Sequence, residues 1–247
     1  MTMSDDGARG HPIDRRTALV ALGGLVIAGC TGGGSDRRSA AVPRSSTSTA
    51  TGTAAECTIT PQETAGPFVL DLHDDPKLVR RDVTEGRTGV PLTLTLTVLA
   101  AGGACAPLAA RRVDLWQCDR AGVYSGFEQP DADTTGQTFL RGIQTTGADG
   151  KVTFTTVYPG WYPGRAPHVH YQVFLADGRV ATSQLAFPEA ITHGVYESSL
   201  YRARGQADTS NQADSVFADG TRGEIPALTG DVSSGYTGAL TVGVERA

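Results

Sequence analysis

Residues Pro91 to Leu99 read P-L-T-L-T-L-T-V-L, with leucine and threonine alternating from Leu92 to Thr97. Because successive side chains of a strand point to opposite faces, such a stretch has one apolar face and one polar face. The alternation therefore predicts a half-buried β-strand that covers a hydrophobic core with its leucine face.

Similar strand signals recur along the chain, and turn residues separate them. Asp119 to Gly122 (D-R-A-G) and Gly147 to Gly150 (G-A-D-G) are turns, and Asp177-Gly178 is a hairpin-type turn. Only Glu189 to Arg204 could hold a short helix or two. Short strands with regular turns predict an all-β fold, as a sandwich or a barrel. The further strands predicted are Arg112 to Gln117, Lys151 to Val157, Val169 to Leu175, Arg179 to Phe187 and Gly238 to Val244.

The composition agrees with this fold class. The chain has 31 glycines and 13 prolines, and only 19% of its residues are charged, which favours many turns and few long helices. A single all-β domain of this size is ordinary, although length alone also fits two small domains. The net charge of −5 and the absence of a dense Lys/Arg cluster argue against a nucleic-acid partner.

Residues 1–29 have the features of an export signal. Arg15-Arg16 precedes an apolar run of 12 residues, Ala18 to Gly29, which is too short to span a bilayer as a helix. The stretch Ile27 to Cys30 (I-A-G-C) resembles the lipobox of bacterial lipoproteins, which implies that Cys30 is lipidated. The paired arginines resemble a twin-arginine signal, and a plain secretory signal is the alternative.

Residues 30–56 are expected to form a flexible tether, because a stretch so rich in Gly, Ser, Thr and Ala buries too little apolar surface to fold. Residues 57–247 would then form the folded domain. We expect an exported protein, at the cell surface or in the periplasm, that reaches the membrane only through its lipid anchor.

Three further cysteines lie in the domain. Cys57 and Cys105 have loop-like contexts, whereas Cys118 follows a predicted strand. Because disulfides persist outside the cytoplasm, we expect a Cys57–Cys105 bond, with three buried free thiols as the alternative.

The stretch Tyr158 to Tyr171 contains the most informative chemistry. His168 and His170 are two positions apart near the start of a predicted strand, so both imidazoles point to the same face. Such a pair can bind a metal. The alternative is that both are solvated strand histidines that bind no metal. His193 is the remaining candidate for a third imidazole, which would make a copper or zinc site.

Tyrosines are dense around this pair, whereas no carboxylate is adjacent to it. A phenol loses its proton only near pH ~10, which makes it a poor ligand for Zn²⁺. A ferric ion is hard and strongly charged, so it favours phenolate oxygen. Histidines together with tyrosines therefore indicate Fe(III) rather than zinc. The tyrosines are Tyr124, Tyr158, Tyr162 and Tyr171.

Five ordered blocks resemble the intradiol ring-cleavage dioxygenases, the family of catechol 1,2-dioxygenase and protocatechuate 3,4-dioxygenase. The third, F-L-R-G-I-Q-T-T-G-A-D-G, is followed by P-G-W-Y-P-G-R-A-P-H-V-H, whose form is closest to the secreted branch. The resemblance implies an antiparallel β-sandwich with long active-site loops. The blocks are Thr60 to Phe68, Val113 to Ser125, Phe139 to Gly150, Pro159 to His170 and Thr182 to Phe187.

The family binds non-haem Fe(III) through two tyrosinates and two histidines. The resemblance assigns His168 and His170 as the imidazole ligands and Tyr124 as the first tyrosinate. The second is Tyr162, six residues before the first histidine, with Tyr158 as the alternative. Tyr162 would also take a proton from the substrate.

Two more residues are carried over from the family motifs as catalytic residues. Arg165 would stabilise the anionic substrate, although a structural salt bridge is the alternative role. Gln184 would orient a ligand or the bound diol. Pro67 and Phe68 match the segment that lines the mouth of the pocket.

The implied activity is cleavage of a catechol-type aromatic diol by O₂, between the two hydroxylated carbons, to a muconate-type diacid. The substrate within this class and the oligomeric state stay open. The alternative functions are a non-catalytic surface β-sandwich that binds a ligand, and the histidine-based copper or zinc site.

Overall fold

The computed structural model of the protein describes residues 57–71 and 75–246. The predicted export signal, the tether and Cys30 lie outside these residues. The expectations for them therefore stay predictions.

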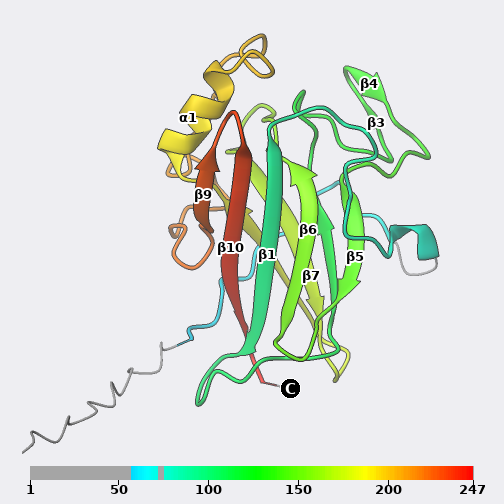
Figure 1. The fold of residues 1–247 in the computed structure, drawn as a ribbon, viewed down its shortest axis with the longest axis vertical. Helices are drawn as coiled ribbons and strands as arrows, with labels where there is room; N and C mark the ends of the chain where they lie inside the picture. Colours follow the sequence, from blue (N-terminus) through cyan, green and yellow to red (C-terminus); the bar gives the residue numbers. More distant parts are fainter. Residues whose placement is uncertain (1–56, 72–74, 247) are drawn as a thin grey trace, which may run out of the picture. The chain divides into compact units, whose positions relative to one another are not determined.

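Two four-stranded β-sheets of the described residues pack against each other (Figure 1). Neighbouring strands are antiparallel, except that β1 and β10 pair in parallel. The predicted all-β sandwich is therefore confirmed. The first sheet has the order β6 (Lys151–Val157), β1 (Pro91–Ala100), β10 (Gly235–Val244), β9 (Ala227–Asp231), and the second has the order β5 (Arg141–Thr145), β2 (Arg112–Trp116), β7 (His168–Phe174), β8 (Val180–Ala186).

The remaining elements are short. The helix α1 (Glu189–Glu197) falls inside the segment for which a helix was predicted. No helix in the described part of the chain is long and apolar enough to cross a membrane. The other elements are a 3₁₀ helix η1 (Pro76–Leu78) and the small hairpin strands β3 (Glu128–Gln129) and β4 (Ala132–Asp133).

The core lies between the two sheets. Leu92, Leu94 and Leu96 of β1 are fully buried while its threonines are only partly buried, as the alternation predicted. Leu115 of β2, Tyr171 of β7 and Leu185 of β8 face the same core from the second sheet. Burying these side chains supplies most of the hydrophobic stabilisation, at roughly 1.5–3 kcal/mol for each large aliphatic or aromatic group.

The opposite face of the second sheet is also covered. Cross-strand partners share a face of a sheet, and the register pairs Arg141 with Trp116, Trp116 with His170, and His170 with Gln184. These four side chains therefore form a row across β5, β2, β7 and β8, on the side away from the core between the sheets. All four are buried, because loops cover this face. The row places polar groups in a buried environment outside the main core.

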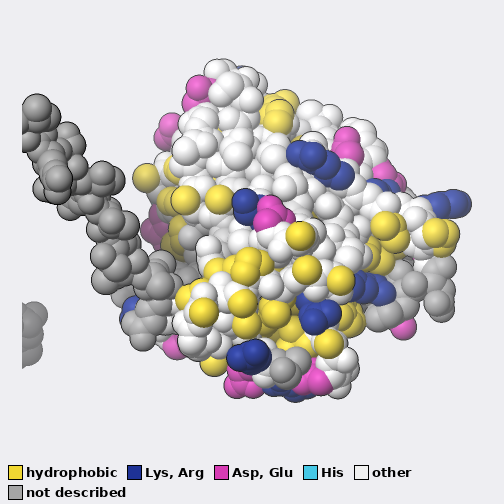
Figure 2. Space-filling model, turned by 60° about the horizontal axis from the view of Figure 1, so that its bottom comes forward, with side chains coloured by type: hydrophobic (Ala, Val, Ile, Leu, Met, Phe, Trp, Pro, Cys, Tyr) yellow, Lys and Arg dark blue, Asp and Glu magenta, His cyan; other side chains and the backbone are white. Residues whose placement is uncertain are grey.

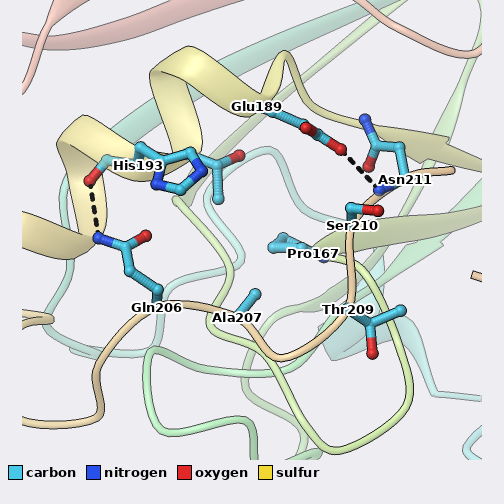
Figure 3. Close-up of a pocket in the computed structure, with 9 residues that line it drawn as sticks. Pro167, Glu189, His193, Gln206, Ala207, Thr209, Ser210 and Asn211 are labelled. Carbon is cyan, nitrogen blue, oxygen red and sulfur yellow. Dashed lines mark hydrogen bonds between the residues drawn. The ribbon is translucent and has the colours of Figure 1, made fainter. Parts of the chain in front are cut away.

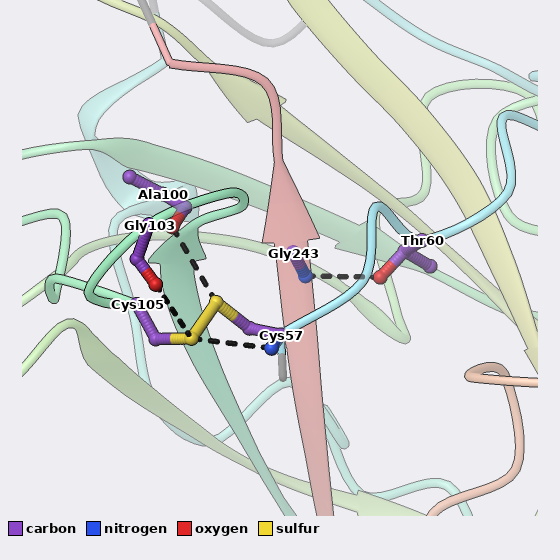
Figure 4. The surroundings of a disulfide bond; sticks show 6 residues. All are labelled: Cys57, Thr60, Ala100, Gly103, Cys105 and Gly243. Carbon is purple, nitrogen blue, oxygen red and sulfur yellow. Dashed lines mark hydrogen bonds between the residues drawn. A yellow bond between two sulfur atoms is a disulfide. The ribbon is translucent and has the colours of Figure 1, made fainter. Parts of the chain in front are cut away.

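A disulfide bond joins Cys57 to Cys105, with the Cα atoms 5.7 Å apart (Figure 4). It fixes the first described residue against the loop that follows β1. Three residues later, Thr60 exchanges two hydrogen bonds with Gly243 of β10, because its N–H donates to the carbonyl (2.8 Å) and its hydroxyl accepts from the N–H (3.0 Å). The segment is thus held along the sandwich edge before it reaches the covered face. Cys118 is a buried free thiol.

Figure 2 shows the end of the sandwich that lies at the bottom of Figure 1. Acidic, basic and apolar side chains are interspersed there, without a continuous field of one charge sign. No histidine of the described residues is visible on this face. The side chains of His168 and His170 are buried, with only 2% and 1% of their surface exposed.

One buried carboxyl group couples stability to pH. Glu224 has no exposed surface, and its carboxylate lies 3.5 Å from the hydroxyl of Ser183 while its second oxygen has no hydrogen-bond partner. Burial, reinforced by the negative charge of Glu63, raises the pKa of Glu224 to about 8.

We predict that Glu224→Gln removes a pH dependence of folding. Between the unfolded pKa near 4.5 and the folded pKa of about 8, the folded protein keeps a proton that the unfolded chain has lost. The free energy of unfolding should therefore fall as pH rises, by up to about 1.4 kcal/mol per pH unit. Urea unfolding at about pH 5 and about pH 7.5 measures this fall. Equal falls in the wild type and in Glu224→Gln would contradict the assignment.

Candidate metal centre

The strand β7 carries the two histidines of the candidate site. His168 and His170 are its first and third residues, so their imidazoles project from the same, outer face of the second sheet. The Nε2 atoms of the two rings are 3.1 Å apart. The indole of Trp116 stacks on the His170 ring, with centroids 4.9 Å apart and an interplanar angle of 4°, and fixes its orientation.

Two tyrosines from different loops reach the same point. Tyr124 comes from the segment between β2 and β3, and Tyr162 comes from the segment between β6 and β7. The Oη atom of each tyrosine lies 3.2 Å from Nε2 of His168. Tyr124 is fully buried, whereas Tyr162 keeps part of its surface exposed. The structure therefore brings together the four residues that the sequence predicted as ligands.

The D-R-A-G turn, Asp119 to Gly122, positions Tyr124. The Asp119 carboxylate accepts hydrogen bonds from the N–H groups of Ala121 (2.8 Å) and Val123 (3.1 Å), which closes the turn. Gly122 has a φ of +81°, and a Cβ at this position would lie 2.2 Å from the carbonyl oxygen of Trp161. Only glycine fits this conformation and this close approach. The turn thus fixes the backbone that leads into Tyr124.

The protonation states of the histidines follow from their contacts. The Ala166 carbonyl can only accept, so Nδ1 of His168 donates to it (2.6 Å) and Nε2 keeps a free lone pair. Burial, and then the charge of Arg165, lower the pKa of His168 to about 3. Burial and the neighbouring His168 lower the pKa of His170 well below its ordinary value. Both imidazoles are therefore neutral and can bind a cation.

The pKa values of the two tyrosines are raised, whereas those of the histidines are lowered. Burial raises the pKa of Tyr124 well above its ordinary value, and it raises the pKa of Tyr162 as well. Both phenols therefore keep their protons in the protein alone, and a strongly charged cation would be needed to make them phenolates.

This donor set fits a ferric ion. The single lone pair of His168 Nε2 has three polar atoms within 3.1–3.2 Å, more than one acceptor can satisfy by hydrogen bonding. One hard cation among two imidazole nitrogens and two phenol oxygens would satisfy all of them. The described residues contain no group of three or more His, Cys, Asp or Glu that could hold a metal. Any metal at this point would thus depend on the tyrosines.

The alternative of a copper or zinc site that uses His193 as a third imidazole is wrong, because the described residues bring no three such ligands together. His193 lies exposed on α1 and lines a separate small cavity (Figure 3). Its carbonyl accepts a hydrogen bond from Gln206 (3.3 Å) across that cavity, and Glu189 accepts one from the N–H of Asn211 (2.9 Å). The helix therefore holds His193 apart from the pair on β7.

Tyr158, the alternative to Tyr162 as the second tyrosinate, lies away from the histidine pair. The Tyr158 ring is part of the main core and packs on Phe187, with centroids 4.5 Å apart. Its hydroxyl is hydrogen-bonded to Thr192 Oγ1 at 2.7 Å. Of the two candidates, only Tyr162 reaches the histidines.

Arg165 and Gln184 join the site through one network. Arg165 donates from Nη1 to the Tyr162 hydroxyl (3.4 Å) and from Nη2 to Oε1 of Gln184 (2.6 Å). Gln184 in turn donates to the backbone carbonyl of Thr64 (2.8 Å). The arginine therefore contacts a candidate ligand directly, and it also forms the salt bridge that was the alternative role.

The partner in that salt bridge is Asp214, which the sequence did not indicate. Its carboxylate is fully buried and accepts two hydrogen bonds from Nε of Arg165, at 2.9 and 3.0 Å. It also accepts from the N–H of Ala166 (2.7 Å), just before the histidine pair. Asp214 stands 49 residues after Arg165 in an irregular segment, so no local pattern points to it.

A cavity of about 340 Å³ opens beside the site. Phe68 stacks on Tyr124, with centroids 4.4 Å apart, and forms one wall together with Tyr162. Phe68 thus lies where the sequence placed the mouth of the pocket. The other lining residues are Ala121, Gly122, Val123, Gln129, Pro130, Asp131, Pro163 and Arg204.

Comparisons with known proteins agree with this arrangement. A family model described as "Dioxygenase" matches residues 65–192, which is more than half of the chain. A structure described as an intradiol ring-cleavage dioxygenase from Tetranychus urticae matches with a TM-score of 0.69 and 30% identity, over 76% of this chain and 95% of that chain.

Two curated relatives are more distant. Catechol 1,2-dioxygenase 1 of Acinetobacter lwoffii is 29% identical over 146 residues, which are 51% of this chain and 45% of the relative. Hydroxyquinol 1,2-dioxygenase of Rhizobium sp. (strain MTP-10005) is 27% identical over 183 residues, 63% of this chain and 59% of the relative. The chain thus spans about half the length of these relatives. The match to the family model shows that the chain belongs to the intradiol ring-cleavage dioxygenase family.

Proposed function

We propose that this protein is a non-haem Fe(III) dioxygenase that uses O₂ to open the ring of a catechol-type diol between its two hydroxylated carbons, giving a muconate-type diacid. One observation carries the proposal. Two neutral imidazoles, one buried phenol and one partly exposed phenol converge on a single point in a chain of the intradiol family. That donor set suits ferric iron and suits zinc or copper poorly.

Tyr124, Tyr162, His168 and His170 would hold the metal. Ferric iron bound there would supply Lewis acidity toward the diol oxygens and the redox capacity for reaction with O₂. The protein would supply position, charge and shielding from water.

Tyr162 and Arg165 would act on the substrate. Tyr162 is the more exposed of the two tyrosines and lines the cavity, which supports a role as the acceptor of a proton from an entering diol. Arg165 lies beside that oxygen and offers a fixed positive charge to the resulting anion. Asp214 and Gln184 hold the guanidinium from two sides, so its orientation is set before the substrate arrives.

The cavity supports a small aromatic substrate. Its volume of about 340 Å³ is at the lower end of the ~300–1,000 Å³ typical of small-molecule pockets. The walls by Phe68, Val123 and Pro163 are apolar and suit an aromatic ring. A single-ring diol fits this space, with room for a substituent.

The proposal places the enzyme outside the cytoplasm, anchored through Cys30. The I-A-G-C stretch supports this, and so does the Cys57–Cys105 disulfide, since such bonds persist in oxidising compartments. In a bacterial host, the wild type should sediment with membranes and Cys30→Ser should be released. Wild-type protein found entirely in the soluble fraction would overturn the anchor.

We predict that the purified, iron-loaded protein consumes O₂ in equal amount to an added catechol-type diol. An oxygen electrode and mass spectrometry of the product, across a panel of substituted catechols, measure this. The expected product has the mass of the diol plus two oxygen atoms. Diols that all remain intact in air, with iron bound, would contradict the proposed activity.

The two tyrosine candidates give a matched pair of variants. Tyr162→Phe should lose the red colour of an iron–tyrosinate protein or change it strongly, and should lower kcat by roughly 10²-fold or more, because the proton acceptor is removed. Tyr158→Phe should keep both, at a cost of about 1 kcal/mol in stability from its lost hydrogen bond to Thr192. The reverse pattern would show that Tyr158 is the ligand.

A further inference from the structure

One cationic side chain lies on the rim of the cavity beside the candidate centre. Of the described residues that line this cavity, Arg204 is the one Lys or Arg, and Asp131 is the one carboxylate. Arg204 is exposed, whereas Tyr162 is partly buried and the two histidines of the centre are almost fully buried. Arg204 therefore occupies the solvent side of the cavity, and a diol that enters from solvent passes it.

Contacts with Trp161 hold the Arg204 side chain in place. Its Nε donates to the backbone carbonyl of Trp161 (2.9 Å), and its guanidinium carbon lies 4.8 Å from the centroid of the Trp161 ring. The backbone N–H of Arg204 donates to the carbonyl of Tyr201 (3.0 Å). The arginine has therefore lost much of the rotamer freedom of a surface side chain before any ligand binds.

The terminal nitrogens of this guanidinium are unused. Within residues 57–71 and 75–246, no hydrogen bond or salt bridge engages Nη1 or Nη2 of Arg204. Nη2 lies beside the turn at Gly122, where an added Cβ would be 3.0 Å from it. An arginine with both terminal nitrogens open can donate two parallel hydrogen bonds to a carboxylate.

Both backbone segments beside Arg204 lead into candidate ligands. Trp161 directly precedes Tyr162, and Gly122 stands shortly before Tyr124. Tyr162 also lines the cavity that Arg204 borders. A diol bound at the centre would therefore share this cavity with Arg204, and the rim would be left for a substituent on its ring.

Asp131 offers the opposite charge on the same rim. It is exposed and lies in the turn between β3 and β4, and no hydrogen bond or salt bridge of the described residues holds its carboxylate. A side chain without such contacts loses more conformational entropy when it binds a ligand than one that is already held. The geometry therefore favours Arg204 as the group that selects the substituent.

We propose that Arg204 is a specificity-determining residue that selects diols whose ring carries an anionic side chain, of which a carboxylate is the simplest. The inference rests on the proposed function and names the substrate class within it. Arg204 binds the side chain, while the centre binds the two hydroxyl oxygens. Because the side chain takes no part in the bond changes, its binding contributes to KM rather than to kcat.

The experiment compares an acid with its own amide, so that the ring and the size of the side chain are matched and the charge differs. Iron-loaded wild type is assayed with 3,4-dihydroxyphenylacetate, 3,4-dihydroxyphenylacetamide and dopamine, whose side chains are anionic, neutral and cationic, and with catechol as the reference. The value of kcat/KM should be at least about fivefold higher for the acid than for the amide, and lowest for dopamine. Added salt should reduce this preference, because the exposed charge of Arg204 is screened.

Variants assign the preference to one side chain. Arg204→Gln should raise KM for the acid at least about fivefold and leave kcat, and KM for the amide, nearly unchanged. Arg204→Lys keeps the charge and should retain part of the preference. Arg202→Gln is the matched control, because Arg202 is exposed and close in the chain but does not line the cavity. It removes the same net charge and should leave the preference unchanged.

The outcomes separate the inference from the proposed function. Equal kcat/KM for the acid and the amide in the wild type, or an equal loss in Arg202→Gln, overturns the inference. A preference for dopamine would assign the rim to Asp131 and overturns it as well. If Arg204→Gln does not fold, the ratio of acid to amide in the wild type and its salt dependence decide. Turnover of catechol alone overturns only the inference, whereas an iron-loaded wild type that leaves catechol and the other three diols intact overturns the proposed function itself.

Discussion

The crowding of polar atoms around Nε2 of His168 is the constraint on which the rest of the site depends. Three neighbours lie at hydrogen-bond distance from the one lone pair of this nitrogen, and the histidine itself is only 2% exposed. Such an arrangement is costly as a set of hydrogen bonds and favourable as the ligand set of one hard cation. The fold must hold four candidate ligand side chains from three separate segments at fixed positions. A sheet that is buried on both faces does this.

The strands and loops divide that task. Strand β7 sets the spacing of His168 and His170, and Trp116 on β2 fixes the ring of the second. The loops bring Tyr124 and Tyr162 over the sheet, and the buried Asp214 ties Arg165 to the backbone before the histidines. Rigid strands therefore carry the imidazoles, whereas the two tyrosines, one of which is proposed to respond to substrate, come from loops, where small movements cost less free energy.

Much of the sandwich and of the candidate site could be predicted from sequence, because both depend on local sequence patterns. The alternation in β1 and the H-x-H pair on β7 both fix which face a side chain occupies. The strand β5 was missed because R-G-I-Q-T shows no clean alternation, and the exposed β9 was missed because it has no buried face. Asp214 could not be found, because its role exists only through contacts between distant segments.

The most direct test of the account is the position of the metal. Crystals of the iron-loaded protein, measured with X-rays on both sides of the iron absorption edge, would locate it without reference to activity. We predict one anomalous peak bonded jointly to the oxygens of Tyr124 and Tyr162 and to Nε2 of His168 and His170. Iron bound elsewhere, or a centre that excludes either tyrosine before substrate is added, would contradict it.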